Sequence, residues 1–208
     1  MNDMTTTIKK GRKFEQVLDG ARVVFRQEGY EGASVDMIAK EAAVSKATLY
    51  SYFPDKKLLF LEVAKDECRR QADQAIERLE TAGDPSLILY EAGERMMRFF
   101  LSPLGRQVYR LVVAESDRFP ELGREFYESG PTIVHETLKR YLRRAVDAGK
   151  LEIEDIELAA DQFPELCKAA LHSRLVLGLQ TDFTDDEIRR VLKGAVEMFM
   201  ARYGKKGT

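Results

Sequence analysis

The stretch SVDMIAKEAAVSKATLYSYFPDK, residues 34–56, decides the fold of the N-terminal part of this 208-residue chain. Ser34 stands just before a short run with helical periodicity, and Asp36 lies in its first turn, which is typical of a helix start. Ser45 is placed to cap a second short helix, which the Phe53-Pro54 pair then ends. We therefore expect helices over about 35–42 and 46–52, joined by a tight turn.

A longer helix precedes this pair, over about residues 10–28, and Gly29 ends it. Its apolar residues repeat at intervals of three and four and form one face. Two short helices packed on a longer one are typical of the helix-turn-helix, whose second short helix enters the DNA major groove. Ser45, Lys46 and Thr48 stand at the start of that second helix, where side chains reach base edges. Tyr50 and Tyr52 can donate hydrogen bonds to the DNA backbone.

The rest of the chain also reads as helices, with no alternating β-branched runs. An all-α fold is therefore expected. Thr184 and Glu187 form a capping box that opens the last helix, which runs to about Tyr203. Pro164 is expected to kink the helix that contains it. The remaining helices are expected over about residues 56–81, 85–101, 104–116, 120–129, 131–148 and 155–178.

Composition limits the classes of function. Hydrophobic residues make up 44% of the chain and charged residues 33%, as in an ordinary globular protein. The net charge is −2, but residues 1–60 hold ten basic and eight acidic residues, a distribution that permits DNA binding. Cys68 and Cys167 show no metal-ligand spacing, and no apolar run is long enough to span a membrane. We expect a cytoplasmic protein without a metal or cofactor and without a membrane partner.

Residues 11–63 resemble the TetR family of regulators. The residues that carry the resemblance are Phe25, Gly29-Tyr30, Ser34-Val35, Ile38-Ala39, Val44-Ser45, Thr48-Leu49-Tyr50, Tyr52-Phe53, Lys56 and Leu59. It implies a homodimeric repressor with a three-helix DNA-binding domain, here residues 1–55. It also implies a C-terminal helical domain for ligand binding and dimerisation, here residues 56–208. Two-fold symmetry would make the double-stranded DNA operator palindromic.

Carried over by position, the resemblance gives each site residue a role. Ser34 would touch a phosphate, and Lys56 would clamp one. The residues at the DNA major groove would be Ser45, Lys46 and Thr48. The DNA backbone would be contacted by Tyr50 and Tyr52. The chain departs from the family pattern at Ala43 and Ala47, where glycine is common. A left-handed Ala43 would cost about 1 kcal/mol.

The C-terminal region is rich in aromatic and adaptable side chains, which favour a pocket for a small apolar or aromatic effector. The same spacing also fits simple core residues and structural histidines, so both interpretations stay open. The candidate pocket residues are Met97, Phe100, Tyr109, Phe126, Phe163, His135 and His172.

Two apolar stripes near the end of the chain favour dimerisation, because the resemblance implies that the last two helices form the dimer interface. The candidate interface residues are Leu171, Leu175, Val191, Ala195 and Phe199.

An enzyme is not expected, since the chain lacks a Gly-rich phosphate loop, an H-E-x-x-H motif and a nucleophile elbow. A helical adaptor that binds protein partners is the alternative to a DNA-binding regulator. It predicts no salt-sensitive affinity for DNA.

Overall fold

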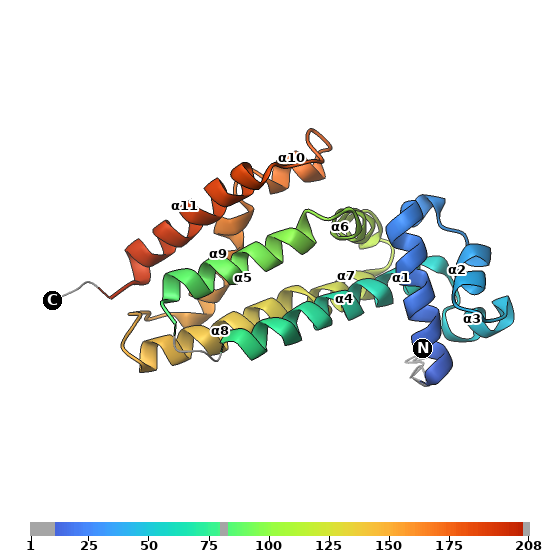
Figure 1. The fold of residues 1–208 in the computed structure, drawn as a ribbon, viewed down its shortest axis with the longest axis horizontal. Coiled ribbons are helices and arrows are strands. Elements are labelled where there is room, and N and C mark those ends of the chain that lie inside the picture. The colour runs from blue at the N-terminus through green and yellow to red at the C-terminus, as the bar shows by residue number, and fades with distance from the viewer. Residues whose placement is uncertain (1–10, 80–82, 206–208) are drawn as a thin grey trace. The chain divides into compact units, whose positions relative to one another are not determined.

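The computed structural model describes residues 11–79 and 83–205, and over these ranges it confirms the all-α fold. Its only β feature there is a single bridge between Leu151 and Gly204. The helices are α1 (Arg12–Gly32), α2 (Val35–Glu41), α3 (Lys46–Tyr52), α4 (Lys56–Leu79), α5 (Pro85–Phe100), α6 (Pro103–Glu115), α7 (Pro120–Ser129), α8 (Pro131–Asp147), α9 (Ile156–Lys168), α10 (His172–Val176) and α11 (Asp185–Tyr203) (Figure 1).

The chain divides into two compact units, Met1–Asp66 and Glu67–Thr208, so that α4 begins in the first and continues into the second. In the first unit, the apolar face of α1 is buried as the periodicity predicts. The Phe60 ring lies 4.8 Å from that of Phe25 and 4.9 Å from that of Tyr30. The start of α4 therefore forms part of the core of the first unit.

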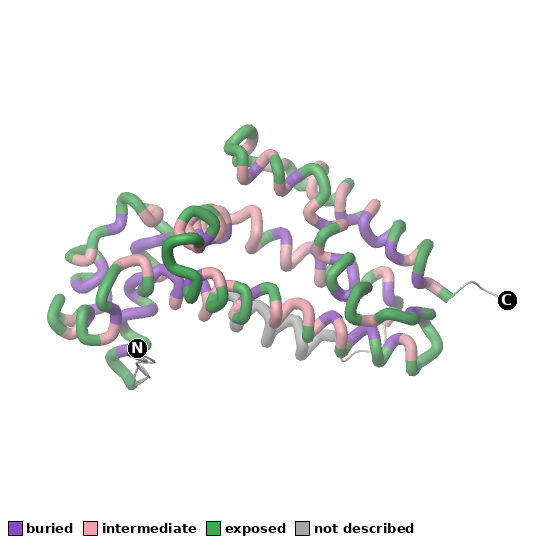
Figure 2. Tube along the Cα trace, turned by 180° about the vertical axis from the view of Figure 1, so that it is seen from behind, coloured by how far each residue is buried: buried purple, intermediate pink, exposed green. Residues whose placement is uncertain are grey.

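In the second unit, α9 contacts α5, α8 and α11 and so lies at the centre of the packing. Buried residues recur along one side of these helices (Figure 2). Gly93 lets α5 approach α9 and α11 closely, because a Cβ there would lie 3.0 Å from both Cys167 Sγ on α9 and Leu192 Cδ2 on α11. Burial raises the pKa of the Cys167 thiol to about 12, which keeps it protonated.

The single helix expected over residues 155–178 is wrong, because the structure has two helices there. Pro164 lies inside α9, and the helix ends only after Lys168. The chain leaves helical geometry at Ala169, whose ψ is 133°. Ala170 follows with a left-handed φ of +62°, and α10 begins at His172. The capping box of Thr184 and Glu187 at α11 is confirmed. The predicted helix ends near residues 10 and 81 and the side chain of Cys68 lie outside the described residues.

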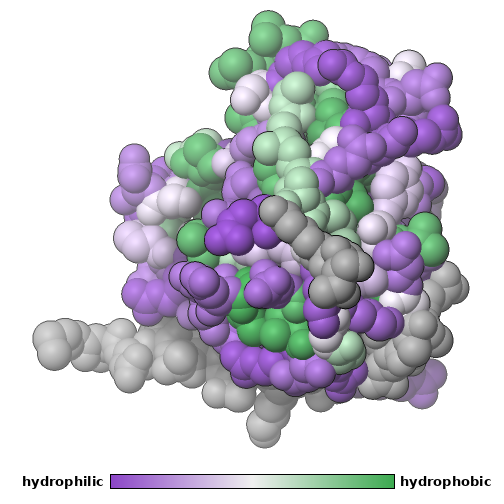
Figure 3. All heavy atoms as spheres, turned by 90° about the vertical axis from the view of Figure 1, so that its left-hand side faces the viewer, coloured by the Kyte–Doolittle hydropathy of each residue, from purple (hydrophilic) through white to green (hydrophobic). Residues whose placement is uncertain are grey.

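On the side of the molecule drawn in Figure 3, most of the described surface is hydrophilic, and apolar residues form smaller areas within it. Among the described residues, no helix is both long enough and apolar enough to cross a membrane.

Candidate functional site

The two short helices are capped as their sequence predicts. The Ser34 hydroxyl accepts a hydrogen bond from the Met37 amide at 3.2 Å, and the Ser45 hydroxyl accepts one from the Thr48 amide at 3.0 Å. Between the helices, Ala43 adopts a φ of +52°, the left-handed conformation considered from the sequence. The chain thus forms the helix-turn-helix with alanine in place of glycine at the turn.

Buried residues hold α3 in place beneath its outer face. Leu49 and Phe53 are both 1% exposed. The ring of Phe14 on α1 stacks on Phe53 at 5.2 Å and meets the ring of Tyr52 edge-on at 5.9 Å. Tyr52 is therefore partly a core residue, which limits it to contacts made by its outer edge.

Gly20 is a structural residue that sequence reasoning missed. It is buried on α1, and a Cβ there would lie 2.6 Å from the backbone nitrogen of Ala42 and 2.8 Å from its Cα. Only glycine lets α1 approach the end of α2 so closely. In the sequence, its only distinguishing sign is that it lies on the apolar face of α1, next to Ala21.

The outer face of α3 presents the side chains proposed to read DNA. Ser45, Lys46 and Tyr50 are exposed, while Thr48 is half-buried with its hydroxyl 2.8 Å from that of Ser45. Lys46 Nζ lies 2.5 Å from a carboxylate oxygen of Asp36 on α2. This hydrogen bond, together with the negative charge of Asp36, raises the pKa of Lys46, so the ammonium stays charged.

Lys56 is engaged inside the first unit. Its ammonium donates to the carbonyl oxygens of Tyr30 at 2.7 Å and Ala33 at 3.0 Å, and it lies 4.5 Å from the centre of the Tyr30 ring. These contacts tie the start of α4 to the end of α1 and place one positive charge at that point. The resemblance implies a phosphate contact for this lysine, in addition to the two carbonyl oxygens that it already binds.

In the second unit, four of the seven candidate pocket residues come together from different helices. The His172 ring lies 4.9 Å from Phe100 and 5.1 Å from Tyr109, and Tyr109 lies 6.5 Å from Phe126. We call Phe100, Tyr109, Phe126 and His172 the aromatic cluster. Met97 and Phe163 are instead buried in the main core of this unit, so the interpretation as core residues fits them.

His172 is the polar member of the aromatic cluster. Its Nε2 is buried and has no hydrogen-bond partner, although the ring as a whole is half-buried. Burial lowers the pKa of His172, and the nearby Lys168 lowers it further, while Glu165 acts in the opposite direction. The imidazole is therefore neutral near pH 7.

His135, which the sequence suggested as a pocket residue, does not lie in the aromatic cluster. Its Nδ1 lies 2.7 Å from a carboxylate oxygen of Asp161, and its Nε2 lies 2.9 Å from one of Glu157, both on α9. Lys139 also pairs with Glu157, at 2.8 Å. The hydrogen bond to Glu157 is the largest cause of a raised pKa for His135, so this ring is a structural link between α8 and α9.

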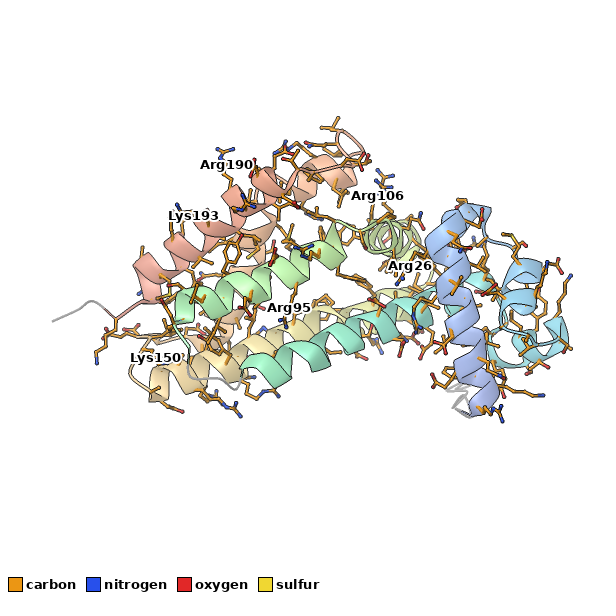
Figure 4. All side chains as sticks on the ribbon, viewed as in Figure 1. Arg26, Arg95, Arg106, Lys150, Arg190 and Lys193 are labelled. Carbon is orange, nitrogen blue, oxygen red and sulfur yellow. The ribbon has the colours of Figure 1, made fainter. Side chains whose placement is uncertain are left out.

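The candidate dimer residues lie mostly inside the protomer. Leu171, Leu175, Ala195 and Phe199 are each 3% exposed or less, and Val191 is partly buried against the same core. The four buried side chains therefore expose almost no surface to a second copy, whereas Val191 keeps part of its surface exposed. The exposed apolar residues nearby are Leu177, Leu179 and Met198. Arg190 and Lys193 project from α11, away from the helices it packs on (Figure 4).

These features define the class of helix-turn-helix DNA-binding proteins that carry a second, all-helical unit. Comparison with known families gives the particular group. Residues 17–63 match the model "Bacterial regulatory proteins, tetR family", and residues 88–205 match "AefR-like transcriptional repressor, C-terminal domain". The second match alone covers more than half of the chain, and the chain belongs to the TetR family of transcriptional regulators.

Individual relatives agree with this assignment. The HTH-type transcriptional repressor AcnR of Corynebacterium glutamicum is 25% identical over 185 residues, which cover 88% of this chain and 91% of AcnR. A TetR-family regulator from Mesorhizobium loti superposes with a TM-score of 0.81 at 26% identity, covering 93% of this chain and 98% of its own. The flavonoid-responsive regulator FrrA has a TM-score of 0.65 at 33% identity, covering 95% of this chain and 100% of its own.

Proposed function

We propose that this protein is a ligand-responsive repressor that binds a palindromic operator as a homodimer and is released by a small apolar or aromatic effector. The DNA-binding role is assigned to residues 1–55 and the other two roles to residues 56–208. The observation that carries the proposal is the capped α2–α3 pair, with Ser45, Lys46 and Tyr50 exposed on the outer face of α3. This is the arrangement that places a recognition helix in the major groove.

The contacts to DNA divide into two kinds. Ser45, Lys46 and Thr48, at the start of α3, would reach base edges, and Tyr50 and Tyr52 would hold the backbone. Ser34 and Lys56 would meet phosphates. Since Lys46 pairs with Asp36 in the free protein, DNA must replace that carboxylate as the partner of the ammonium.

Dimerisation through the last helices is supported by the exposed apolar residues there. Leu177 is 70% exposed, Leu179 74% and Met198 63%. Burial of such residues between two copies removes apolar area from water. We therefore place the dimer contact on these outer residues rather than on the buried stripe inferred from the sequence.

Release by an effector requires that the effector bind the DNA-free conformation more tightly than the DNA-bound one. Support for an aromatic effector comes from the aromatic cluster and from the flavonoid response named for FrrA, which is 33% identical.

The test is a fluorescence anisotropy titration of the full-length protein against DNA upstream of its own gene, with random DNA as control, at several salt concentrations. We expect tight, salt-dependent binding that exceeds the control. Lys46→Ala and Tyr50→Ala should weaken it without changing the dimer mass measured by light scattering. Arg143→Ala removes one exposed positive charge from the second unit and serves as the matched control.

Two results would count against the proposal. Loss of the dimer in Lys46→Ala would contradict the place given to that residue. Binding that stays no better than random DNA, also in a genome-wide selection of bound fragments, would favour the helical adaptor instead.

A further inference from the structure

We propose that the aromatic cluster binds a planar aromatic compound through a hydroxyl group on that compound, with His172 Nε2 as its hydrogen-bond partner. This inference rests on the proposed function, because it names the chemistry of the effector in the unit already assigned to it. It starts from one observation: a buried imidazole nitrogen without a partner, held among aromatic rings.

An unpartnered buried nitrogen is the exception in folded proteins. Buried polar groups nearly always have a hydrogen-bond partner, because removing them from water without one destabilises the fold. Arg22, whose Nε is also buried, is held by hydrogen bonds from its guanidinium to Asp19 and Asp66. His172 lacks such compensation at Nε2, and a ligand that supplies the missing bond gains binding energy without breaking one.

The protonation of His172 favours a hydroxyl over a carboxylate or an ammonium. The ring is neutral, since burial lowers its pKa, so Nε2 is either a single donor or a single acceptor, depending on the tautomer. A hydroxyl can donate and accept, and it therefore suits both tautomers. A carboxylate can only accept and an ammonium can only donate.

The surroundings select an aromatic, uncharged or weakly acidic ligand. Phe100 and Tyr109 both lie about 5 Å from the His172 ring, which favours ring-to-ring contacts. The charged groups that act on His172 are Lys168 and, more weakly, Glu165, and these two are paired at 2.5 Å. The Lys168 ammonium also lies 5.9 Å from the centre of the Phe100 ring. Because Lys168 acts on His172 more strongly than Glu165 does, the electrostatic potential there disfavours a cationic ligand and is compatible with a neutral phenol.

The position of the aromatic cluster offers a route to the neighbouring helices. Phe100 is the last residue of α5, Tyr109 and Arg110 are on α6, and His172 begins α10. Arg110 donates to the carbonyl oxygen of Val176 at the end of α10, at 2.9 Å. A ligand that displaces the His172 ring would therefore act on α6 through both a ring contact and a hydrogen bond.

The experiment compares two probes of nearly equal shape, 4-phenylphenol and 4-methylbiphenyl, by calorimetric titration of the full-length protein. We expect 4-phenylphenol to bind about tenfold more tightly, the effect of one hydrogen bond to an otherwise unpartnered group. His172→Phe keeps an aromatic ring without the nitrogen and should remove the difference. His172→Gln carries an amide that reaches the Nε2 position and should restore part of it. His135→Gln is the matched control, a histidine outside the aromatic cluster, and should keep the full difference.

Three outcomes would overturn the inference. They are equal affinity for the two probes, an unchanged preference in His172→Phe, and no binding of 4-phenylphenol up to 1 mM, a Kd that corresponds to a binding free energy of about −4 kcal/mol. Circular dichroism and thermal unfolding of each variant establish that it is folded. The outcome is separable from that of the proposed function. If the protein binds its operator but not the phenol, only the ligand assignment is overturned. If it binds the phenol through His172 but binds no operator, only the assignment as a DNA-binding repressor is overturned.

Discussion

Replacing Gly20 by alanine should open the packing between α1 and α2. The added Cβ would lie 2.6 Å from the Ala42 nitrogen, 2.7 Å from its Cβ and 2.8 Å from its Cα. Two of these three atoms belong to the backbone, which cannot rotate out of the way. Overpacking of this kind costs up to about 3 kcal/mol, and the better helix propensity of alanine returns about 1 kcal/mol. We expect a net loss of about 2 kcal/mol.

Native-state hydrogen exchange measures this loss locally. A loss of about 2 kcal/mol corresponds to about a 30-fold fall in protection of the α2 and α3 amides, because each 1.4 kcal/mol is a factor of ten. Amides in α11 should keep their protection. Gly32→Ala, at the end of the same helix, is the matched control, since a Cβ there meets only Glu28 Cβ at an ordinary 3.4 Å. Unchanged or increased protection of α2 in Gly20→Ala would refute the reasoning.

Three further predictions concern a turn, an ion pair and a histidine. Ala43→Gly relieves a left-handed alanine and should raise the free energy of unfolding by up to about 1 kcal/mol in a denaturant titration; a lower value would contradict the strain. Asp36→Asn removes the negative charge that pairs with Lys46. The affinity for any DNA, measured by fluorescence anisotropy at low salt, should therefore rise by about two- to fivefold. An unchanged affinity would show that the pair does not affect DNA binding. His135 has a raised pKa, so its link to Glu157 stabilises the fold below pH 6.5 and loses this contribution as the pH rises through the folded-state pKa. The melting temperature of His135→Gln should therefore fall below that of wild type at pH 6 and approach it at pH 8.5, and a gap that widens with pH would reverse the sign.

The DNA-binding unit could be predicted from sequence because its signals are local. The bounds of α3 match those expected, since Ser45 caps its start and Phe53-Pro54 ends it. Capping acts over three residues and needs no knowledge of the rest of the fold. The close approach of Gly20 to Ala42 was missed for the opposite reason. It depends on two helices that meet in space, 22 residues apart in the chain.

The C-terminal assignments depend on partners that lie far apart in sequence, which sequence patterns do not reveal. His135 and His172 look alike as polar residues in apolar surroundings. Structure separates them, because Glu157 and Asp161 reach His135 from α9 while His172 Nε2 has no partner. Apolar periodicity likewise shows which face of a helix is buried but not whether its own chain or a second copy covers it. For Leu171 and Phe199 the protomer itself does so.

The break between α9 and α10 lies beside the proposed effector site. Over the described residues, Ala43 and Ala170 are the two residues other than glycine with positive φ, and each such conformation costs about 1–2 kcal/mol. Ala43 forms the turn between α2 and α3. Ala170 follows the end of α9 and precedes His172, whose ring meets Phe100 and Tyr109, by two residues. Strain of this kind persists where the surrounding structure enforces it, most often at functional sites. Both strained alanines thus lie beside the residues to which we assign DNA and effector.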